Sequence, residues 1–154
     1  MKRDRGEIEN LLARYCETYD AGDFAAYAAL FAHGRVSGPT GAFETPDEIV
    51  AYHTKNCRLY DGSPMTRHVT TNIEIHVDPA GATATSRSYV TIYQATPTFP
   101  LQVIFVGQYL DDFVKIDATW WFEHRVAVPH LVGDLSAHAN EYIAKTDGGP
   151  DDRT

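Results

Sequence analysis

The chain has 154 residues and a mass of 17.1 kDa, which is the size of one domain and too short for two. Hydrophobic residues make up 44% and charged residues 22%, so we expect a buried core rather than wholesale disorder. The formal net charge of −8 argues against a nucleic-acid binder. The first residues are charged and then amphipathic, unlike a secretory signal, and no apolar run is long enough to cross a membrane. We therefore expect a soluble, cytoplasmic protein.

Three helices are predicted in the first part of the chain. The first begins at Asp4, a good N-cap with Glu7 three residues on, and its apolar face ends at Asp20, shortly before a glycine. A second, short helix is predicted over residues 24–31. The third begins within residues 45–48, where a threonine, a proline and two acidic residues suit the first turn.

From about residue 65 the chain is rich in Thr, Val, Ile and aromatic residues. Four strands are predicted, separated by short turns, over residues 66–78, 82–95, 101–113 and 118–128. Turns this short join antiparallel neighbours. Helices followed by one antiparallel sheet predict an α+β domain with the helices on one sheet face. We assign residues 1–140 to this single domain and residues 141–154 to a polar tail.

Asp20 and His68 are the candidate catalytic residues. Asp20 ends an apolar helical face, so its carboxylate is predicted to point inward, although a solvated helix-end aspartate is the simpler alternative. His68 begins the first long strand on the face opposite Val69 and Ile73, with Asn72 on its own side. A histidine beside a carboxylate makes a general base near neutral pH, whereas a lone strand histidine is more often a hydrogen-bonded structural residue.

Other familiar chemistries have no support in the sequence. There is no histidine or cysteine cluster with metal-ligand spacing, no nucleophile elbow and no glycine-rich phosphate loop. We therefore expect neither a metal nor an organic cofactor. The nine tyrosines are the remaining group with polar tips, and those in elements whose faces meet are Tyr15, Tyr19, Tyr89, Tyr93 and Tyr109.

Four strings resemble the SnoaL-like, or scytalone-dehydratase-like, branch of the nuclear-transport-factor-2-like superfamily. They are RYCETYDAGDFAAYAALFA at 14–32, TRHVTTNIEIHVD at 66–78, GATATSRSYVTIYQ at 81–94 and DDFVKIDATWWFEHR at 111–125. The resemblance implies a cone-shaped α+β barrel, in which three helices close a curved, mostly antiparallel sheet around an apolar pocket. Characterised dehydratase relatives also imply a homo-oligomer, with a trimer favoured over a dimer.

The resemblance also implies roles for individual residues. Asp20 and His68 match the family's proton-abstracting pair. Tyr15 is similar to the pocket tyrosine of bile-acid 7α-dehydratase, Tyr19 to the substrate-holding tyrosine of scytalone dehydratase, and Asn72 to an asparagine of hexachlorocyclohexane dehydrochlorinase. Tyr93 stands where scytalone dehydratase has a second histidine, and Tyr109 is a further substrate-binding candidate. The arginine of the last strand has no counterpart in register, although Arg125 is near in sequence.

These expectations favour a cofactor-independent lyase that acts on a small apolar cyclic substrate through acid–base chemistry. An isomerase or an epoxide hydrolase in the same pocket is the alternative among enzymes. The non-enzymatic alternative is a small-molecule-binding protein or an assembly subunit of the same fold. Apolar residues on both faces of one strand (Leu101 and Val103 against Ile104 and Val106) also predict a homo-oligomer that covers the helix-free sheet face.

Overall fold

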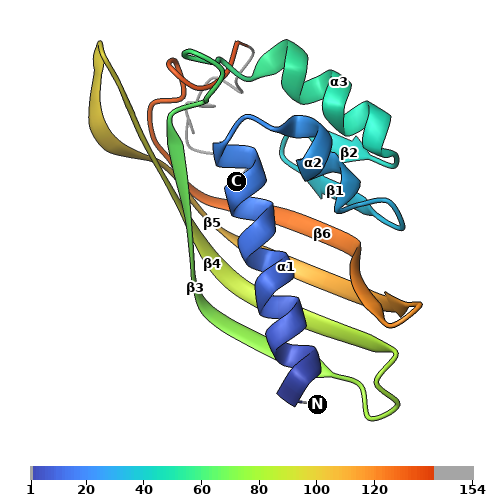
Figure 1. Cartoon of the computed structure of the whole chain (residues 1–154). Coiled ribbons are helices and arrows are strands. Elements are labelled where there is room, and N and C mark those ends of the chain that lie inside the picture. The colour runs from blue at the N-terminus through green and yellow to red at the C-terminus, as the bar shows by residue number, and fades with distance from the viewer. Residues whose placement is uncertain (1, 141–154) are drawn as a thin grey trace, which may run out of the picture.

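The computed structural model describes residues 2–140. Its elements in chain order are α1 (Lys2–Asp20), α2 (Phe24–Ala29), β1 (Arg35–Gly38), β2 (Gly41–Phe43), α3 (Pro46–Asn56), β3 (Thr66–Val77), β4 (Thr83–Thr96), β5 (Phe99–Ile116) and β6 (Thr119–Val132). The long helix α1 runs along one face of a strongly twisted sheet, and α2 and α3 lie over one end of it (Figure 1). The α+β prediction is confirmed. The predicted tail lies outside the described residues.

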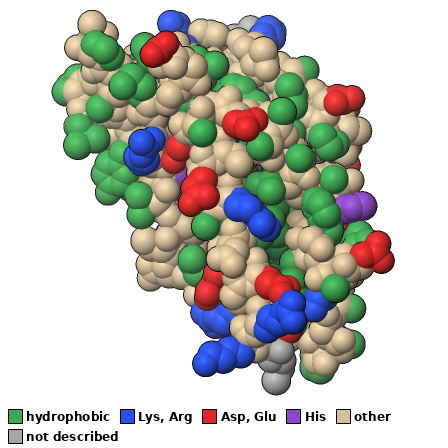
Figure 2. All heavy atoms as spheres, in the orientation of Figure 1, with side chains coloured by type: hydrophobic (Ala, Val, Ile, Leu, Met, Phe, Trp, Pro, Cys, Tyr) green, Lys and Arg blue, Asp and Glu red, His purple; other side chains and the backbone are tan. Residues whose placement is uncertain are grey.

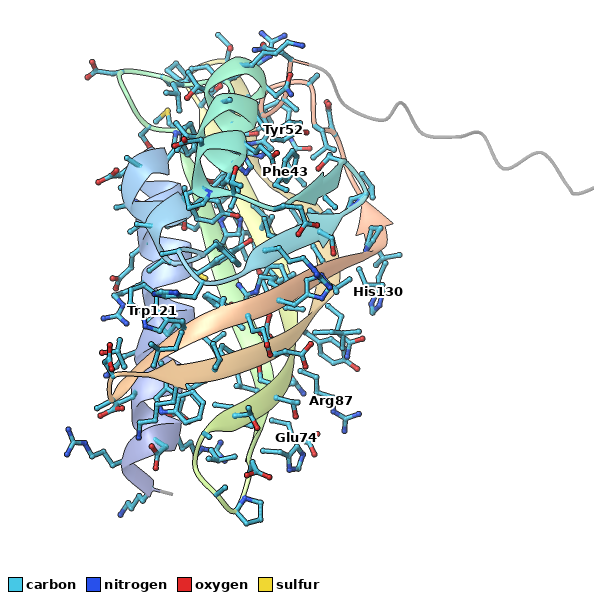
Figure 3. All side chains as sticks on the ribbon, turned by 90° about the vertical axis from the view of Figure 1, so that its right-hand side faces the viewer. Phe43, Tyr52, Glu74, Arg87, Trp121 and His130 are labelled. Atoms are coloured by element: carbon cyan, nitrogen blue, oxygen red, sulfur yellow. The ribbon has the colours of Figure 1, made fainter. Side chains whose placement is uncertain are left out.

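The sheet has six strands in the order β2-β1-β6-β5-β4-β3. The four long strands form the predicted antiparallel meander, and β1 extends it by pairing parallel to β6. The strands β1 and β2 were not predicted, because they are only four and three residues long and show no alternation of apolar residues. Through them the sheet reaches α3, where Phe43 of β2 lies against Tyr52 with ring centres 4.7 Å apart (Figure 3).

The predicted helix starts are correct at α2 and α3 but wrong at α1. Thr45 and Glu48 form a complete capping box at the start of α3, and the Asp23 carboxylate accepts a hydrogen bond from the Ala26 backbone N–H at 2.9 Å. The helix α1 already includes Lys2. The Asp4 carboxylate is instead bound by the Lys115 ammonium at 2.6 Å and by the Trp120 indole N–H at 3.2 Å. It therefore ties the start of α1 to the sheet.

A β-bulge divides β3 into two halves that face differently. The register between β3 and β4 shifts between Thr71 and Glu74, and Asn72 adopts a left-handed conformation with φ of 53°. One extra residue reverses the alternation. His68 therefore shares the helix-covered face with Ile75, whereas Val69 is exposed on the other face. The prediction that an apolar face lies opposite the His68 face along the whole strand is wrong for this reason.

The core lies between α1 and the sheet. Side chains from one face of α1 pack with aromatic residues of β5, β6 and the α2 region, and the fully buried members include Ile8, Leu11, Phe31, Phe113 and Phe122. Charged side chains of both signs are scattered over the face that carries α1, while hydrophobic side chains gather around the projecting β4–β5 hairpin at the upper left (Figure 2). None of the helices within residues 2–140 is both long and apolar enough to cross a membrane.

Candidate functional site

A cavity of about 420 Å³ opens where α1, α2 and α3 meet the concave sheet face. This volume lies within the range of about 300–1,000 Å³ that is usual for small-molecule sites. Its apolar wall comes mainly from the sheet and includes Ile92, Ile104, Phe105, Ala127, Pro129 and Val132. Its polar groups are tyrosine hydroxyls, three histidines, an asparagine and a threonine; no Asp, Glu, Lys or Arg of the described chain lines it.

The end of α1 holds Asp20 against the start of β3. Gly22, with φ of 75°, ends the helix in the left-handed conformation that glycine adopts without strain. A Cβ atom at Gly22 would collide with the carbonyl oxygen of Gly62, so the helix end and the loop before β3 can approach this closely only with glycine there. The Ser63 hydroxyl from that loop donates to the Asp20 backbone carbonyl at 3.2 Å. Asp20 itself is 8% exposed, so its carboxylate is not solvated.

Asp20 and His68 form the contact that the sequence predicts. Asp20 Oδ1 lies 2.6 Å from His68 Nδ1, and Asp20 Oδ2 accepts a hydrogen bond from the His68 backbone N–H at 2.8 Å. The Thr66 hydroxyl donates to Asp20 Oδ1 at 2.7 Å. Three hydrogen bonds therefore fix the carboxylate, and the carboxylate fixes the imidazole with Nδ1 as the donor. Nε2 forms no hydrogen bond within residues 2–140 and is the ring nitrogen left for a bound molecule.

The surroundings keep the Asp20 carboxyl ionised. Burial raises its pKa, but the hydrogen bond and charge of His68, together with the Thr66 hydroxyl, outweigh that effect and bring the pKa below its ordinary value. The His68 side chain is only 4% exposed. An ionised carboxylate behind a shielded imidazole selects one tautomer of the ring. This pair, called the dyad below, has the geometry of a general base.

Tyrosine side chains surround the dyad, and three of those singled out in the sequence line the cavity: Tyr15, Tyr19 and Tyr109. The Tyr19 ring packs edge-on against the His68 ring with centres 4.9 Å apart. The Tyr27 hydroxyl donates to the Tyr15 hydroxyl at 3.1 Å. Burial raises the pKa of Tyr19, Tyr27 and Tyr109 well above the ordinary value of 10, so these hydroxyls stay protonated and can serve as donors.

Two of the predicted substrate-binding residues lie elsewhere. Asn72 forms the β-bulge on β3 and is exposed, away from the cavity. Tyr93 is 37% exposed and pairs with Arg67 and Val103 in the sheet, with its side chain on the face opposite that of its cavity-lining neighbour Ile92. Strand alternation explains the position of Tyr93, since residues next to an inward-facing one point outward. The β-bulge explains the position of Asn72, which strand alternation alone would place on the face of His68.

The cavity also contains polar residues that the sequence interpretation passed over, namely His53, Asn56 and His138. His53 and Asn56 lie four and seven residues after the buried Ile49 on α3, a helical spacing that could have identified them. His138 follows β6 in a segment without periodicity, and no sequence signal points to it. Burial, followed by the charges of neighbouring histidines, lowers the pKa of His53 and of His138 to about 4, so both rings are neutral at pH 7.

Arg125 lies beneath the cavity wall rather than in the cavity. Its guanidinium forms a two-pronged ion pair with the buried Asp111 carboxylate, at 2.6 and 2.8 Å, and the Ser86 hydroxyl donates to the same carboxylate. The guanidinium carbon lies 4.0 Å from the ring centres of both Tyr15 and Tyr109. Arg125 thus holds the two tyrosine rings that face the cavity. Within residues 2–140, no group of three or more His, Cys, Asp or Glu side chains could hold a metal ion.

A curved sheet closed by three helices around a pocket with a buried Asp–His pair defines the class of cone-shaped α+β domains. The SnoaL-like domain model matches residues 2–126, and the chain belongs to this family of the nuclear-transport-factor-2-like superfamily. No curated protein matches the chain in sequence.

Solved structures support the same fold. The protein Rv3472 of Mycobacterium tuberculosis, of unknown function, is 26% identical, with a TM-score of 0.69 over 82% of this chain and 71% of that one. A provisionally assigned scytalone dehydratase from Novosphingobium aromaticivorans is 25% identical, with a TM-score of 0.68 over 87% and 91% of the two chains. A cystatin-like-fold protein of unknown function from Nostoc punctiforme is 24% identical, with a TM-score of 0.72 over 88% and 97%.

Proposed function

We propose that the chain is a cofactor-independent lyase of the dehydratase type that uses Asp20 and His68 as its acid–base pair. The observation that carries this proposal is the 2.6 Å contact between Asp20 Oδ1 and His68 Nδ1 at the wall of the cavity. A binding protein has no need of a buried, ionised carboxylate held by three hydrogen bonds behind an imidazole. The similarity to a provisionally assigned scytalone dehydratase supports the same reaction class.

In the proposed step, His68 Nε2 takes a proton from a carbon next to a carbonyl group. The C–H electron pair becomes the new C=C bond, the C–O bond of a neighbouring hydroxyl breaks, and the imidazolium returns the proton to the departing hydroxide as water. Asp20 stabilises the transient imidazolium by its charge. Tyr15 and Tyr109 are the candidate donors to the carbonyl oxygen, on which negative charge accumulates during proton removal.

The cavity supports a neutral, cyclic and mainly apolar substrate. No Asp, Glu, Lys or Arg side chain of residues 2–140 reaches its lining, and His53 and His138 stay neutral because of their low pKa. An ionised substrate would therefore lose its hydration without gaining a counter-charge, which is costly. The aromatic and aliphatic wall complements the faces of a compact ring system.

The test is a mass-spectrometric screen of neutral cyclic β-hydroxy ketones and cyclic epoxides, performed in deuterated water with the wild-type protein and with His68→Ala. We expect loss of water from at least one class of compound with the wild type and none with the variant. Uptake of deuterium without loss of water would indicate an isomerase, and gain of water by cyclic epoxides would indicate an epoxide hydrolase. Compounds that bind in the cavity but remain unchanged under all conditions would contradict the enzyme proposal and leave a binding protein.

A further inference from the structure

The helix α3 presents a histidine, His53, to the same cavity as His68. Four aromatic rings hold the His53 ring, with ring centres 5.1–5.5 Å away: Tyr19, Phe24, Tyr27 and Tyr52. The helix itself is anchored by its capping box and by the packing of Tyr52 on Phe43 of β2 (Figure 3). The position of the His53 ring in the cavity wall is therefore set before a ligand binds.

The ring nitrogens of His53 are left for a bound molecule. Neither forms a hydrogen bond within residues 2–140, and the residue is only half-buried. This distinguishes them from His138 Nδ1 and Asn56 Oδ1, which also lack a partner there but are sealed from solvent. An apolar ligand that displaced water from His53 would leave these polar atoms unpaired, which is unfavourable. A ligand with a matching polar group avoids that cost.

The surroundings of His53 suit binding rather than proton transfer. Burial, followed by the charges of His138 and His68, lowers its pKa to about 4, and no carboxylate of the described chain acts on this pKa. His53 therefore lacks the ionised partner that Asp20 provides for His68. A neutral imidazole has one donor nitrogen and one acceptor nitrogen. A hydroxyl group, which both donates and accepts, pairs with either of them.

The two histidines are close enough to meet one ligand. Both imidazoles pack edge-on against the Tyr19 ring, with centres 5.1 Å from it for His53 and 4.9 Å for His68. We propose that His53 forms a hydrogen bond with a hydroxyl group of the substrate and so orients the substrate toward His68. This inference rests on the proposed function for what the ligand is, and it adds to that ligand a free hydroxyl besides the reacting groups.

The test is the binding of β-naphthol and of its methyl ether to the His68→Leu protein, measured by isothermal titration calorimetry. In this variant the dyad cannot accept the hydroxyl, so any preference for β-naphthol comes from another group. We expect a preference of roughly tenfold, the difference that one hydrogen bond makes. The double variant His68→Leu/His53→Phe should lose it, because phenylalanine keeps the ring contacts but has no polar atom. Equal binding of the two probes to His68→Leu would overturn the proposal, as would a preference that persists in the double variant.

A measurement on the wild type decides the matter if His68→Leu does not fold. The probes are a naphthalenediol with one hydroxyl on each ring, so that one remains for the dyad, and its dimethyl ether. Nuclear magnetic resonance of the ring nitrogens of labelled histidines follows their hydrogen bonding, and the His53 signals are those absent from His53→Phe. We expect the diol, but not the ether, to shift the His53 signals, while those of the exposed His76 stay unchanged. Unshifted His53 signals with the diol bound would overturn the proposal. Both measurements follow binding alone, so a chain without lyase activity would not affect them, and their failure would leave the dyad untouched.

Discussion

At the scale of single residues, the dyad divides one function between two side chains. His68 presents Nε2 to the cavity, and Asp20 never meets a bound molecule, because Oδ1 is bound by His68 Nδ1 and the Thr66 hydroxyl and Oδ2 by the His68 backbone. Asp20 is therefore a positioning residue, whereas His68 is the candidate catalytic base. The two act as a unit, and their contributions to turnover are not additive.

Substitution of the dyad should lower turnover strongly. We expect His68→Ala and Asp20→Asn each to reduce kcat by roughly 10²- to 10⁴-fold, and the double variant to fall little below the worse single one. The measurement is steady-state turnover on the compound found by the screen. Tyr93→Phe is the matched control, because that hydroxyl lies on the outer sheet face. Full activity of a folded His68→Ala protein would exclude His68 as the base.

The buried histidines should make the fold sensitive to mild acid. The pKa of His53 is lowered from its ordinary value of 6.5 to about 4, so between these values the unfolded chain binds more protons than the folded one. The titration of His53 therefore leaves the free energy of unfolding unchanged above pH 6.5. As the pH falls from 6.5 toward 4, it lowers the free energy of unfolding by up to about 1.4 kcal/mol per pH unit. The pKa of His53 is lowered because its ring is buried among the rings of Tyr19, Phe24, Tyr27 and Tyr52.

His53→Phe preserves those ring contacts and removes the titration. Urea unfolding at a series of pH values from about 7 to 4.5 should then show a shallower loss of stability than in the wild type. His76→Phe is the control, because the His76 side chain is exposed and its ion pair with Glu74 lies at the surface. Parallel pH profiles for the wild type and His53→Phe would show that His53 is not held neutral by burial.

At the scale of elements, the bulge at Asn72 sets which side chains of β3 reach the cavity and which reach the core. A non-glycine residue in the left-handed conformation is strained unless its side chain is small and polar. We expect Asn72→Val to lower the free energy of unfolding by about 1–2 kcal/mol, and Asn72→Gly to leave it nearly unchanged. Urea unfolding measures both. Thr71→Val, at the neighbouring exposed position of β3, where φ is not positive, should cost little. An Asn72→Val protein with the same free energy of unfolding as the wild type would mean that the bulge does not need the left-handed conformation at residue 72.

The same element shows how far the sequence could predict the site. Asp20 was predictable because it ends a strongly periodic helix, so its face follows from the helical repeat. His68 was predictable from the family resemblance, whereas strand alternation placed it opposite the apolar face. Asn72 was assigned to the site on strand alternation alone, and one inserted residue removed it from the face of His68. The strands β1 and β2 and the segment with His138 could not be predicted, because pairing across 87 residues or a single bridge leaves no local pattern.

At the scale of the whole molecule, the helix-free face of the sheet carries an apolar patch. It is formed by outward-facing side chains of β3 to β6, including Val69, Tyr89, Tyr93, Leu101, Val103, Leu110 and Leu131. Leu101 and Leu131 are 73% and 68% exposed. We propose that further copies of this chain cover the patch, because exposed apolar side chains drawn from four strands suit the self-complementary interface of a homo-oligomer.

Light scattering coupled to size-exclusion chromatography at micromolar concentration should therefore give the mass of an oligomer, with a trimer expected before a dimer. Leu101→Glu and Leu131→Glu should each shift the protein toward the monomer, because a charge in a buried contact loses its hydration. The midpoint of thermal unfolding measured at high dilution should stay the same, since neither residue contributes to the core. A monomeric wild type would contradict the assembly.

The order of contacts along the chain has a consequence for biosynthesis. The helix α1 is made first, but its side chains contact residues that are made much later. Asp20 binds His68, which is 48 residues further along the chain. Tyr19 contacts His138 after 119 residues, and Asp4 contacts Lys115 after 111 residues. Until β3 to β6 have left the ribosome, the apolar stripe of α1 has no sheet to cover it. Long-range contacts of this kind slow folding and prolong exposure of apolar surface. A chaperone that shields the nascent α1 until translation reaches β6 would therefore raise the yield of folded protein.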